Sequence, residues 1–243
     1  MSNLIIKAEK LYKIYNLQRQ KTFKEFLPAL FSGSKTRKKV NALSDINFDL
    51  FKGQSLGIMG KNGSGKSTLL KLIAGVTIPT MGDIKVFARV APLIELGAGF
   101  HPELTGKENI FLNGSILGIK KRDMDKLYDS IIDFSELHNF IDEPIKFYSS
   151  GMYMRLAFSV AVAKTPDILL VDEILAVGDA KFQEKCLNRI KKFQKSGTTM
   201  IMVSHNIEQI REHCNQGLVL QNGKQKFFGS ISEAIEKYQK IIT

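Results

Sequence analysis

The sequence predicts an α/β protein in which helices cover a mostly parallel β-sheet. Residues 55–59, SLGIM, form a continuous apolar run, and residues 67–75 then follow a helical pattern that stops at a glycine. Two more apolar runs, at 168–171 and 198–204, are typical of buried strands and have a helical pattern between them. This strand–helix–strand alternation indicates a parallel sheet with helices on its faces.

The N-terminal part of the chain combines a strand with an inserted segment. Residues 1–15 predict a strand, whereas residues 16–39 interrupt two strand-like regions and are interpreted as an insertion. Apolar side chains of the insertion share one face of a helix that Pro28 shortens or kinks. They are Phe23, Phe26, Leu27, Leu30 and Phe31. Two uses fit this face and the basic stretch after it: packing on the protein's own sheet, or contact with an anionic membrane surface.

The rest of the chain divides into a helical part and a second part of the core. Helical patterns dominate residues 102–160, which predict a separate helical lobe. Residues 161–243 complete the core, with a hairpin indicated by the Asn-Gly pair at 222–223 and a C-terminal helix opened by Ser230, with Glu233 three residues later. We therefore expect a single domain over residues 1–243.

The composition is that of an ordinary globular chain with an excess of positive charge. No window approaches about 18 consecutive apolar residues, and the early charges of Lys7 and Glu9 exclude a secretory signal. The isolated Cys186 and Cys214 predict reduced thiols in a cytosolic protein. The net charge of +11 indicates an anionic partner. No nucleic acid is expected, because a zinc pattern, an aromatic RNA-binding signature and a basic zipper are all lacking.

Residues 60–68, GKNGSGKST, match the pattern G-x-x-x-x-G-K-[ST] between a strand and a helix. Its glycines let backbone amides approach phosphates, Lys66 supplies a positive charge, and Ser67 supplies a hydroxyl for Mg²⁺. A turn that only caps a helix would not need all of these positions. The pattern predicts a P-loop that binds the phosphates of a nucleotide, with Mg²⁺ as cofactor. The expected nucleotide-binding residues are Gly60, Lys61, Asn62, Gly63, Ser64, Gly65, Lys66, Ser67 and Thr68.

The apolar run at 168–171 ends in two acids, Asp172 and Glu173. Alone they would indicate an acidic loop after a strand, but beside a P-loop Asp172 is expected to hold Mg²⁺. Glu173 lies at the carboxyl end of the strand, where a carboxylate can orient and activate an attacking water. His205 ends the next strand, and both a structural place and a contact to the γ-phosphate fit it.

Three further features each keep two interpretations. Residues 147–158, FYSSGMYMRLAF, put serine and glycine at a helix start, which suits an N-cap or a bound anion. Asp179 is either the N-cap of a helix or a residue of the site. Tyr15 either packs within its strand or stacks on adenine.

In chain order, the motifs GKNGSGKST, YSSGM, ILLVDE, AVGD and VSH resemble the nucleotide-binding subunit of an ABC transporter. The resemblance covers essentially the whole chain. It implies a P-loop NTPase core with a mostly parallel sheet, an N-terminal antiparallel β subdomain and an inserted α-helical subdomain that carries a signature motif. It also implies ATP hydrolysis coupled to transport, at the cytoplasmic face of a cell membrane, with a separate transmembrane permease subunit.

The resemblance answers why serine and glycine open the helix at 147–158. In the family, the signature motif contacts the ATP held by a second copy, so two copies close head to tail around two ATPs. The motif is usually Leu-Ser-Gly-Gly-Gln. Ser149 and Gly151 keep its two phosphate-contacting positions here, whereas Ser150 and Met152 depart from the usual residues.

Single residues take family roles by the same resemblance. Tyr15 resembles the adenine-stacking aromatic, Glu173 the catalytic carboxylate, Asp179 the acid of the cross-dimer loop, and His205 the switch histidine. The family usually has a glutamine that contacts Mg²⁺ between the P-loop and the helical lobe, and this region has none. Glu95 is the best-placed substitute, because a carboxylate also ligates Mg²⁺.

Several segments, with the insertion at 16–39, are similar to exporters of bacterial surface glycopolymers such as O-antigen, capsule or teichoic acid. These segments are IELGAGFHPELTGKENI, YSSGMYMRLAFSVAV and DEILAVGDAKFQEKC. One alternative is a soluble, non-transport ABC ATPase acting on ribosomes or DNA, although such proteins usually carry two cassettes or coiled-coil arms. A P-loop kinase is another, but it leaves YSSGM and VSH unexplained.

Overall fold

The structure is a computed structural model of the 243-residue chain. It describes residues 3–17, 38–94, 96–172, 178–204 and 206–242. No helix among these residues is long and apolar enough to cross a lipid bilayer.

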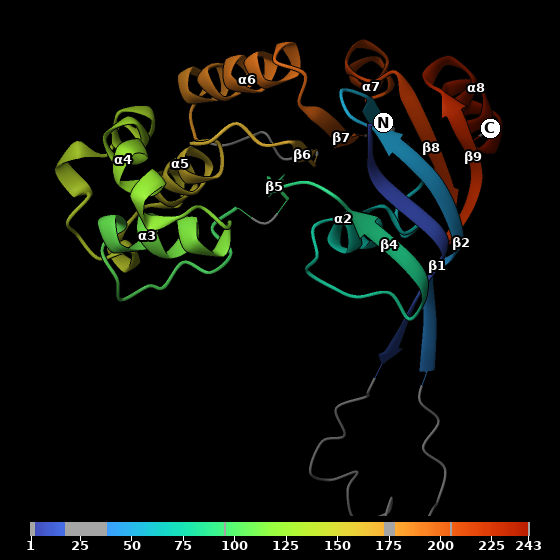
Figure 1. Ribbon diagram of the computed structural model, residues 1–243, viewed down its shortest axis with the longest axis horizontal. Helices are drawn as coiled ribbons and strands as arrows, with labels where there is room; N and C mark the ends of the chain where they lie inside the picture. Colours follow the sequence, from blue (N-terminus) through green and yellow to red (C-terminus); the bar gives the residue numbers. More distant parts are fainter. Residues whose placement is uncertain (1–2, 18–37, 95, 173–177, 205, 243) are drawn as a thin grey trace, which may run out of the picture.

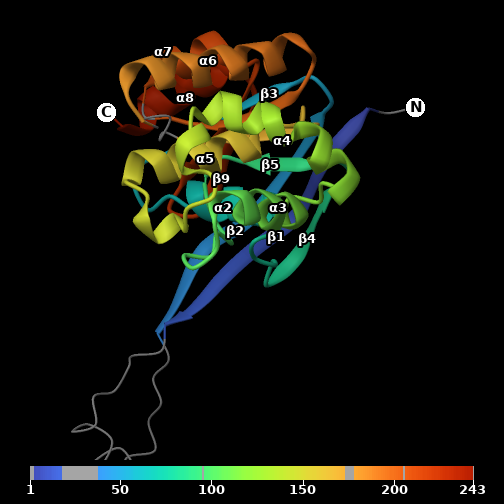
Figure 2. The same ribbon diagram turned by 90° about the vertical axis from the view of Figure 1, so that its left-hand side faces the viewer.

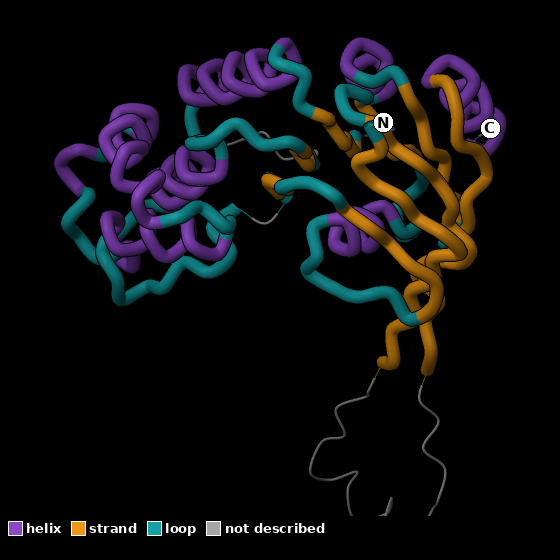
Figure 3. Tube along the Cα trace, in the orientation of Figure 1, coloured by secondary structure: helices purple, strands orange, loops and turns teal. Residues whose placement is uncertain are grey.

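The described residues form one nine-stranded sheet in the order β4-β1-β2-β9-β8-β3-β7-β6-β5. Neighbouring strands from β8 through β3, β7, β6 and β5 run parallel, which confirms the predicted parallel core. Figure 3 shows this strand layer with helices on both sides. The strands are β1 (Leu4–Leu17), β2 (Lys38–Phe51), β3 (Ser55–Met59), β4 (Met81–Val86), β5 (Val90–Pro92), β6 (Ile168–Val171), β7 (Thr199–Val203), β8 (Gln216–Gln221) and β9 (Lys224–Ser230).

The N-terminal part of the sheet is antiparallel, because β1 pairs with both β2 and β4 in that sense. At the other end of the chain, β8 and β9 form the predicted hairpin. Asn222 and Gly223 turn it with φ values of +50° and +76°, the left-handed backbone that a tight two-residue turn requires. The Ser230 hydroxyl then donates to the Glu233 carboxylate at 2.6 Å, where the C-terminal helix begins.

Side chains of the central strands alternate between two buried clusters, as the period of a strand demands. In β6, Ile168 and Leu170 point into the cluster under α2, and Leu169 and Val171 into the cluster under α5 to α8. Figure 1 shows α6, α7 and α8 along one side of the sheet and α2 on the other. The helices are α2 (Lys66–Ile73), α3 (Gly106–Ile116), α4 (Lys121–Ser135), α5 (Ser150–Ala161), α6 (Ala180–Lys195), α7 (Ile207–His213) and α8 (Ile231–Ile242).

Helices α3, α4 and α5 gather away from the antiparallel strands, and they face the viewer in Figure 2. They enclose a third buried cluster that includes Ile110, Ile131 and Leu156. Short 3₁₀ turns at His138–Phe140 and Ile145–Phe147 connect α4 to α5. This is the helical lobe that the sequence predicts between the two parts of the core. Its boundaries at 102 and 160, like the other domain limits, stay predictions.

The strands on either side of the expected insertion at 16–39 extend into it from both ends. Strand β1 continues to Leu17 and β2 begins at Lys38, and these two residues are register partners. Lys39 likewise pairs with Asn16, so the last lysines of the expected flexible basic stretch belong to a strand. Lysine is a poor strand former, but pairing with the neighbouring strand outweighs that preference. The apolar helix face predicted within 23–31 lies outside the described residues.

Candidate functional site

The P-loop joins the end of β3 to the start of α2, as the sequence predicts. Gly63 and Gly65 have φ values of +77° and +106°, which residues with a side chain rarely adopt. A Cβ atom on Gly65 would also lie 2.6 Å from the carbonyl oxygen of Ala42. The loop therefore needs glycine at this position for both its backbone angle and its closeness to β2.

The P-loop lines a hollow of about 370 Å³, here called the P-loop hollow. Asp172 enters it from the end of β6 and Val203 from the end of β7, as expected for ligands at the carboxyl ends of parallel strands. Its remaining lining comes from β2, at residues 40–42, which the sequence analysis missed. The alternating pattern of that strand gave no sign that it passes beside the P-loop.

The chemistry of the P-loop hollow fits a bound phosphate group. The Lys66 ammonium donates to the carbonyl oxygens of Gly60 at 2.7 Å and Lys61 at 3.2 Å, so its charge is held inside the loop. The buried Ser64 hydroxyl has no hydrogen-bond partner among the described residues. Ser67 and Asp172 line the same hollow, and their oxygens are ligands that Mg²⁺ prefers. The residues present therefore fit ATP with Mg²⁺.

Tyr15 lies beside the P-loop hollow but is not part of its lining. It is the register partner of Val40, which does line the hollow. Its side chain is 36% exposed, and the Lys13 ammonium lies 5.0 Å from the ring centroid. The ring is thus available to solvent at the edge of the site, a position compatible with stacking.

Ser149 is the N-cap of α5, because the backbone N–H of Met152 donates to its hydroxyl at 3.2 Å. Ser149 and Ser150 are both exposed, so capping leaves them accessible. They line a second hollow of about 680 Å³, the signature hollow, together with Gly151, residues 136–137, 140, 152, 154–155 and 178–179. The capping interpretation is thereby confirmed, and it does not exclude an anion.

Asp179 is the N-cap of α6 and accepts a hydrogen bond from the backbone N–H of Phe182 at 2.9 Å. It also forms an ion pair with Arg155 and lines the signature hollow. The backbone hydrogen bond from Phe182, with the contribution of Arg155, holds the pKa of Asp179 below its ordinary value. Sequence motifs indicate Asp179 but not Arg155 or its second partner, Glu136, because no motif marks a contact between distant helices.

The P-loop hollow and the signature hollow share no lining residue. The first is lined by β2, the loop before α2 and the ends of β6 and β7, and the second by residues around the starts of α5 and α6. Figure 1 shows α5 apart from β2 and α2. Glu95, Glu173 and His205 fall outside the described residues. One described neighbour of His205, Asn206, is the N-cap of α7 and accepts hydrogen bonds from two backbone amides of that helix.

A third hollow, here called the apolar groove, separates α2 and β4 from the helical lobe and measures about 640 Å³. Exposed Val76, Ile78 and Ile116 line it. So do Gly97 and Ala98, which belong to the loop that follows Glu95. The Tyr153 hydroxyl donates to the carbonyl oxygen of Gly97 at 2.9 Å and thus ties this loop to α5. Sequence patterns did not indicate the groove, since its walls come from distant segments.

Comparison with known proteins identifies the family. Residues 43–176, more than half of the chain, match the family described as ABC transporter. The chain belongs to the ABC transporter family. It is therefore an ABC transporter ATPase, which confirms the resemblance found in the sequence.

Curated ABC transporter proteins match most of the chain. The O-antigen export system ATP-binding protein RfbB of Klebsiella pneumoniae is 47% identical over 203 residues, covering 84% of this chain and 82% of that protein. The teichoic acids export ATP-binding protein TagH of Staphylococcus saprophyticus is 39% identical over 240 residues, covering 99% and 90%. The RfbB protein of Myxococcus xanthus is 45% identical over 225 residues, and the match spans only 52% of its length.

Solved ABC transporter structures share the fold. A dimeric, post-hydrolysis structure of the ATP-binding cassette MJ0796 bound to ADP and Pi superposes with a TM-score of 0.70 at 22% identity, covering 93% of this chain and 99% of that chain. An ATP-binding subunit of an ABC transporter gives a TM-score of 0.72 at 19% identity, covering 97% and 93%. At these identities the likeness supports the cassette fold alone.

Proposed function

We propose that the chain is the ATP-hydrolysing subunit of an exporter that moves a bacterial surface glycopolymer across the cytoplasmic membrane. The observation that carries this proposal is the 39–47% identity, over most of the chain, to proteins named for O-antigen and teichoic acid export. The P-loop hollow supplies the means of binding ATP. The subunit works at the cytoplasmic face of the membrane with a separate transmembrane permease.

The apolar groove is the proposed docking place for the permease. It carries exposed Val76, Ile78 and Ile116, and a groove with apolar walls is suited to an amphipathic segment of a partner. The loop after Glu95 forms part of its wall through Gly97. A permease segment in this groove would thus contact a loop that begins beside a proposed Mg²⁺ ligand.

Two copies of the chain are proposed to close head to tail around two ATPs. Each copy supplies a P-loop hollow and a separate signature hollow, so each bound ATP would be completed by the partner's signature residues. Ser149, Ser150 and Gly151 lie at the start of α5, where backbone N–H groups and the helix dipole favour the γ-phosphate. Asp179, in the same hollow, would meet the partner chain.

Within each site the proposed roles rest on the lining of the P-loop hollow and on the place of Tyr15 beside it for the described residues, and on the family resemblance for Glu95. The P-loop amides and Lys66 bind the phosphates, Tyr15 stacks on adenine, and Ser67, Asp172 and Glu95 hold Mg²⁺. When bound, Mg²⁺ neutralises charge on the phosphate oxygens.

Glu173 and His205, which like Glu95 lie outside the described ranges, complete the proposed chemistry. Glu173 accepts the proton of the attacking water, which makes that water a better nucleophile. His205 contacts the γ-phosphate. Both assignments rest on the family resemblance and on the strands that precede them.

Two substitutions test this proposal. Glu173→Gln should preserve ATP binding, nearly abolish hydrolysis and let an ATP-dependent dimer accumulate on size exclusion, because the amide keeps the shape but cannot act as a base. Ser149→Glu should block that dimer by placing a carboxylate against the γ-phosphate. Monomeric ATP affinity should be unchanged, since Ser149 is not part of the P-loop hollow. Wild-type turnover in the first variant would remove Glu173 from its role, and loss of monomeric binding in the second would contradict the two-copy site.

Co-purification separates export from the alternative of a soluble ABC ATPase. An export subunit should co-purify with a polytopic membrane protein from the native membrane. A ribosome- or DNA-associated ATPase should instead leave the membrane fraction and travel with nucleic acid.

The basic stretch at residues 35–39, whose last two lysines begin β2, is proposed to contact the anionic leaflet. Its cations are Lys35, Arg37, Lys38 and Lys39. Each cation near such a surface contributes about 1 kcal/mol. Replacing them with Gln should reduce binding to vesicles containing anionic lipid while soluble ATPase activity stays unchanged. Unaltered vesicle binding would exclude the membrane role, and a fall in ATPase activity would assign these residues to the catalytic fold.

A further inference from the structure

Arg155 lies on α5, one turn after the signature residues, and its side chain joins three elements. One guanidinium nitrogen donates to the Glu136 carboxylate at 2.9 Å, and the other pairs with the Asp179 carboxylate. The guanidinium also lies 4.8 Å from the ring centroid of Phe182 on α6. A planar guanidinium can serve two acids in fixed directions, which an ammonium cannot. These contacts connect the start of the signature helix to the residue that begins α6.

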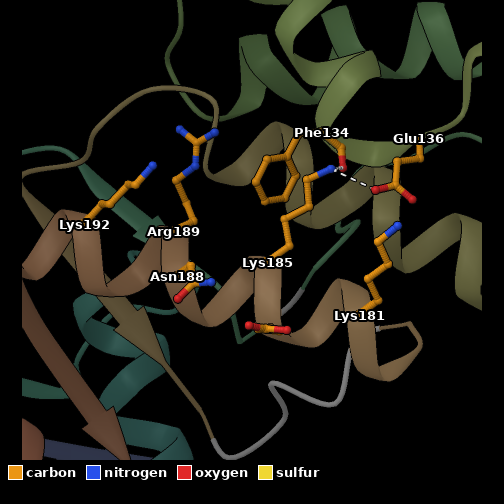
Figure 4. A pocket seen from close by; sticks show the side chains of 8 residues that line it. Phe134, Glu136, Lys181, Lys185, Asn188, Arg189 and Lys192 are labelled. Atoms are coloured by element: carbon orange, nitrogen blue, oxygen red, sulfur yellow. Dashed lines mark hydrogen bonds and ion pairs between the residues drawn. The ribbon is translucent and has the colours of Figure 1, made fainter.

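Glu136 is built into this cluster as a double acceptor. It ends α4 with φ +61°, a left-handed backbone that glycine or asparagine adopts more easily. Its second oxygen accepts from the Lys185 ammonium at 3.0 Å, and Lys185 also donates to the carbonyl oxygen of Phe134 at 2.8 Å (Figure 4). The hydrogen bonds from Lys185 and Arg155 hold the pKa of Glu136 below its ordinary value. Glu136 is therefore a fixed anionic anchor for Arg155.

We propose that Arg155 is a positioning residue that holds Asp179 and the N-terminus of α5 in one fixed arrangement, so that Asp179 meets the partner chain while the N-terminus of α5 meets that chain's nucleotide. The inference rests on the proposed two-copy ATPase and deepens it. All three residues of the cluster, Glu136, Arg155 and Asp179, line the signature hollow beside Ser149. The Arg155 side chain is only 18% exposed, and each of its two terminal guanidinium nitrogens pairs with a carboxylate. Arg155 therefore orients the groups that line the signature hollow and does not itself bind the nucleotide.

The exposure of Glu136 and Asp179 indicates that their ion pairs with Arg155 contribute little to folding stability, which distinguishes a positioning role from a purely structural one. The carboxylates of Glu136 and Asp179 are 41% and 60% exposed, and ion pairs of such exposure contribute little to folding. Loss of Arg155 should therefore change dimer closure and turnover more than unfolding. A purely structural arginine would show the opposite balance.

The primary test compares Arg155→Gln and Arg155→Lys with Lys164→Gln. The control removes an ion pair of α4, Lys164 with Asp123 at 3.1 Å, that lies outside the signature hollow. We expect Arg155→Gln to lower kcat by about 10- to 100-fold, because misplacing groups around a reacting phosphate has effects of that size. Monomeric ATP affinity should stay within about twofold, since Arg155 does not line the P-loop hollow. Arg155→Lys should retain part of the activity, and Lys164→Gln nearly all of it.

A double-substitution cycle tests whether Arg155 acts through Asp179. Asp179→Asn keeps an oxygen to cap α6 and removes the ion-pair charge, so the helix start should survive. If the two residues act together, Arg155→Gln with Asp179→Asn should lose no more kcat, and no more ATP-dependent dimer in a Glu173→Gln background, than the worse single variant. Multiplicative losses would overturn the proposal, as would wild-type kcat in Arg155→Gln.

The controls distinguish this inference from the function on which it rests. If the unsubstituted chain does not hydrolyse ATP and the Glu173→Gln variant forms no ATP-dependent dimer, the two-copy ATPase and the positioning role both fail. If the unsubstituted chain is active and Arg155→Gln matches it in kcat and dimer formation, only the positioning role fails. A fall in thermal stability with unchanged kcat would assign Arg155 to the fold.

Discussion

Replacing Tyr153 with phenylalanine isolates a hydrogen bond that ties the loop of the apolar groove to α5. The hydroxyl donates to the carbonyl oxygen of Gly97 at 2.9 Å, and the ring packs edge-on against Phe100 with centroids 5.3 Å apart. Phenylalanine keeps the ring contact and removes only the donor. The same carbonyl also accepts from the backbone N–H of Phe100 at 2.9 Å. Tyr153→Phe thus leaves the Gly97 oxygen with one partner instead of two.

Because that carbonyl stays satisfied, the cost should lie near the lower end for a lost hydrogen bond, about 0.5–1 kcal/mol. For a chain of this size each 1 kcal/mol lowers the melting temperature by about 2–4 °C. We therefore expect a fall of about 1–4 °C in the melting temperature. Local opening should increase at the same time, so backbone amides in residues 97–101 should exchange faster with solvent.

Thermal unfolding and hydrogen exchange by mass spectrometry measure both effects. Tyr238→Phe is the matched control, because Tyr238 packs against the core and its hydroxyl bonds to no residue that the structure describes. It should leave both measurements unchanged. Equal exchange at 97–101 in Tyr153→Phe and the unsubstituted chain would refute the idea that the hydroxyl holds the loop. A loss well above about 2 kcal/mol would show that more than one hydrogen bond depends on it.

Substitutions at two glycines, a labelling experiment and a double cysteine variant give further checks. Gly65→Ala should abolish ATP binding measured by titration calorimetry, because the added Cβ would lie 2.6 Å from the carbonyl oxygen of Ala42 in β2. The control Gly75→Ala should retain binding, because Gly75 has a similar positive φ of +73° but open space around it. Equal ATP affinity in the two variants would contradict this geometry. Burial raises the pKa of Cys186 and Cys214 to about 12, so both thiols stay protonated at pH 8 and should react with a maleimide far more slowly than in the urea-unfolded chain. The stability that the folded chain gains from keeping both thiols neutral is complete below their ordinary pKa of 9.0 and is lost as pH rises toward about 12. Equal labelling rates in the folded and the unfolded chain would show that the thiols are exposed. The double variant Cys186→Ala with Cys214→Ala should keep its ATPase activity, because neither thiol lines the P-loop or signature hollow.

Local signals predicted the elements that local physics decides. The apolar runs at 55–59 and 168–171 become strands, and their alternate residues divide between the two faces of the sheet. The Asn-Gly pair gives the hairpin because its turn requires a left-handed backbone. The P-loop motif predicted its own location, since the glycine angles and the following helix are encoded within nine residues.

Contacts between distant segments could not be predicted from one sequence. Strand order places β9 beside β2 and β8 beside β3, and no local pattern specifies such neighbours. Arg155 shows the same limit, because one of its partners precedes it by 19 residues and the other follows it by 24. Lys38 was expected in a flexible stretch, and only its pairing with Leu17 places it in a strand. The roles of Glu95, Glu173 and His205 stay predictions.

The β1–β2 pair has a mechanical consequence. Each strand has 14 residues and so spans about 45 Å, whereas β4 pairs with β1 only as far as Tyr12 and β9 meets β2 at Ser44. Beyond these points β1 and β2 pair only with each other among the described strands, and the loop before β4 contacts them through the Thr80 hydroxyl, which accepts from the backbone N–H of Ile14 at 3.0 Å. The ribbon extends past the sheet in Figures 1 and 3. Val40 belongs to this extending part of β2 and lines the P-loop hollow. A load applied at the tip, where residues 18–37 are attached, is therefore also a load on the wall of the nucleotide site.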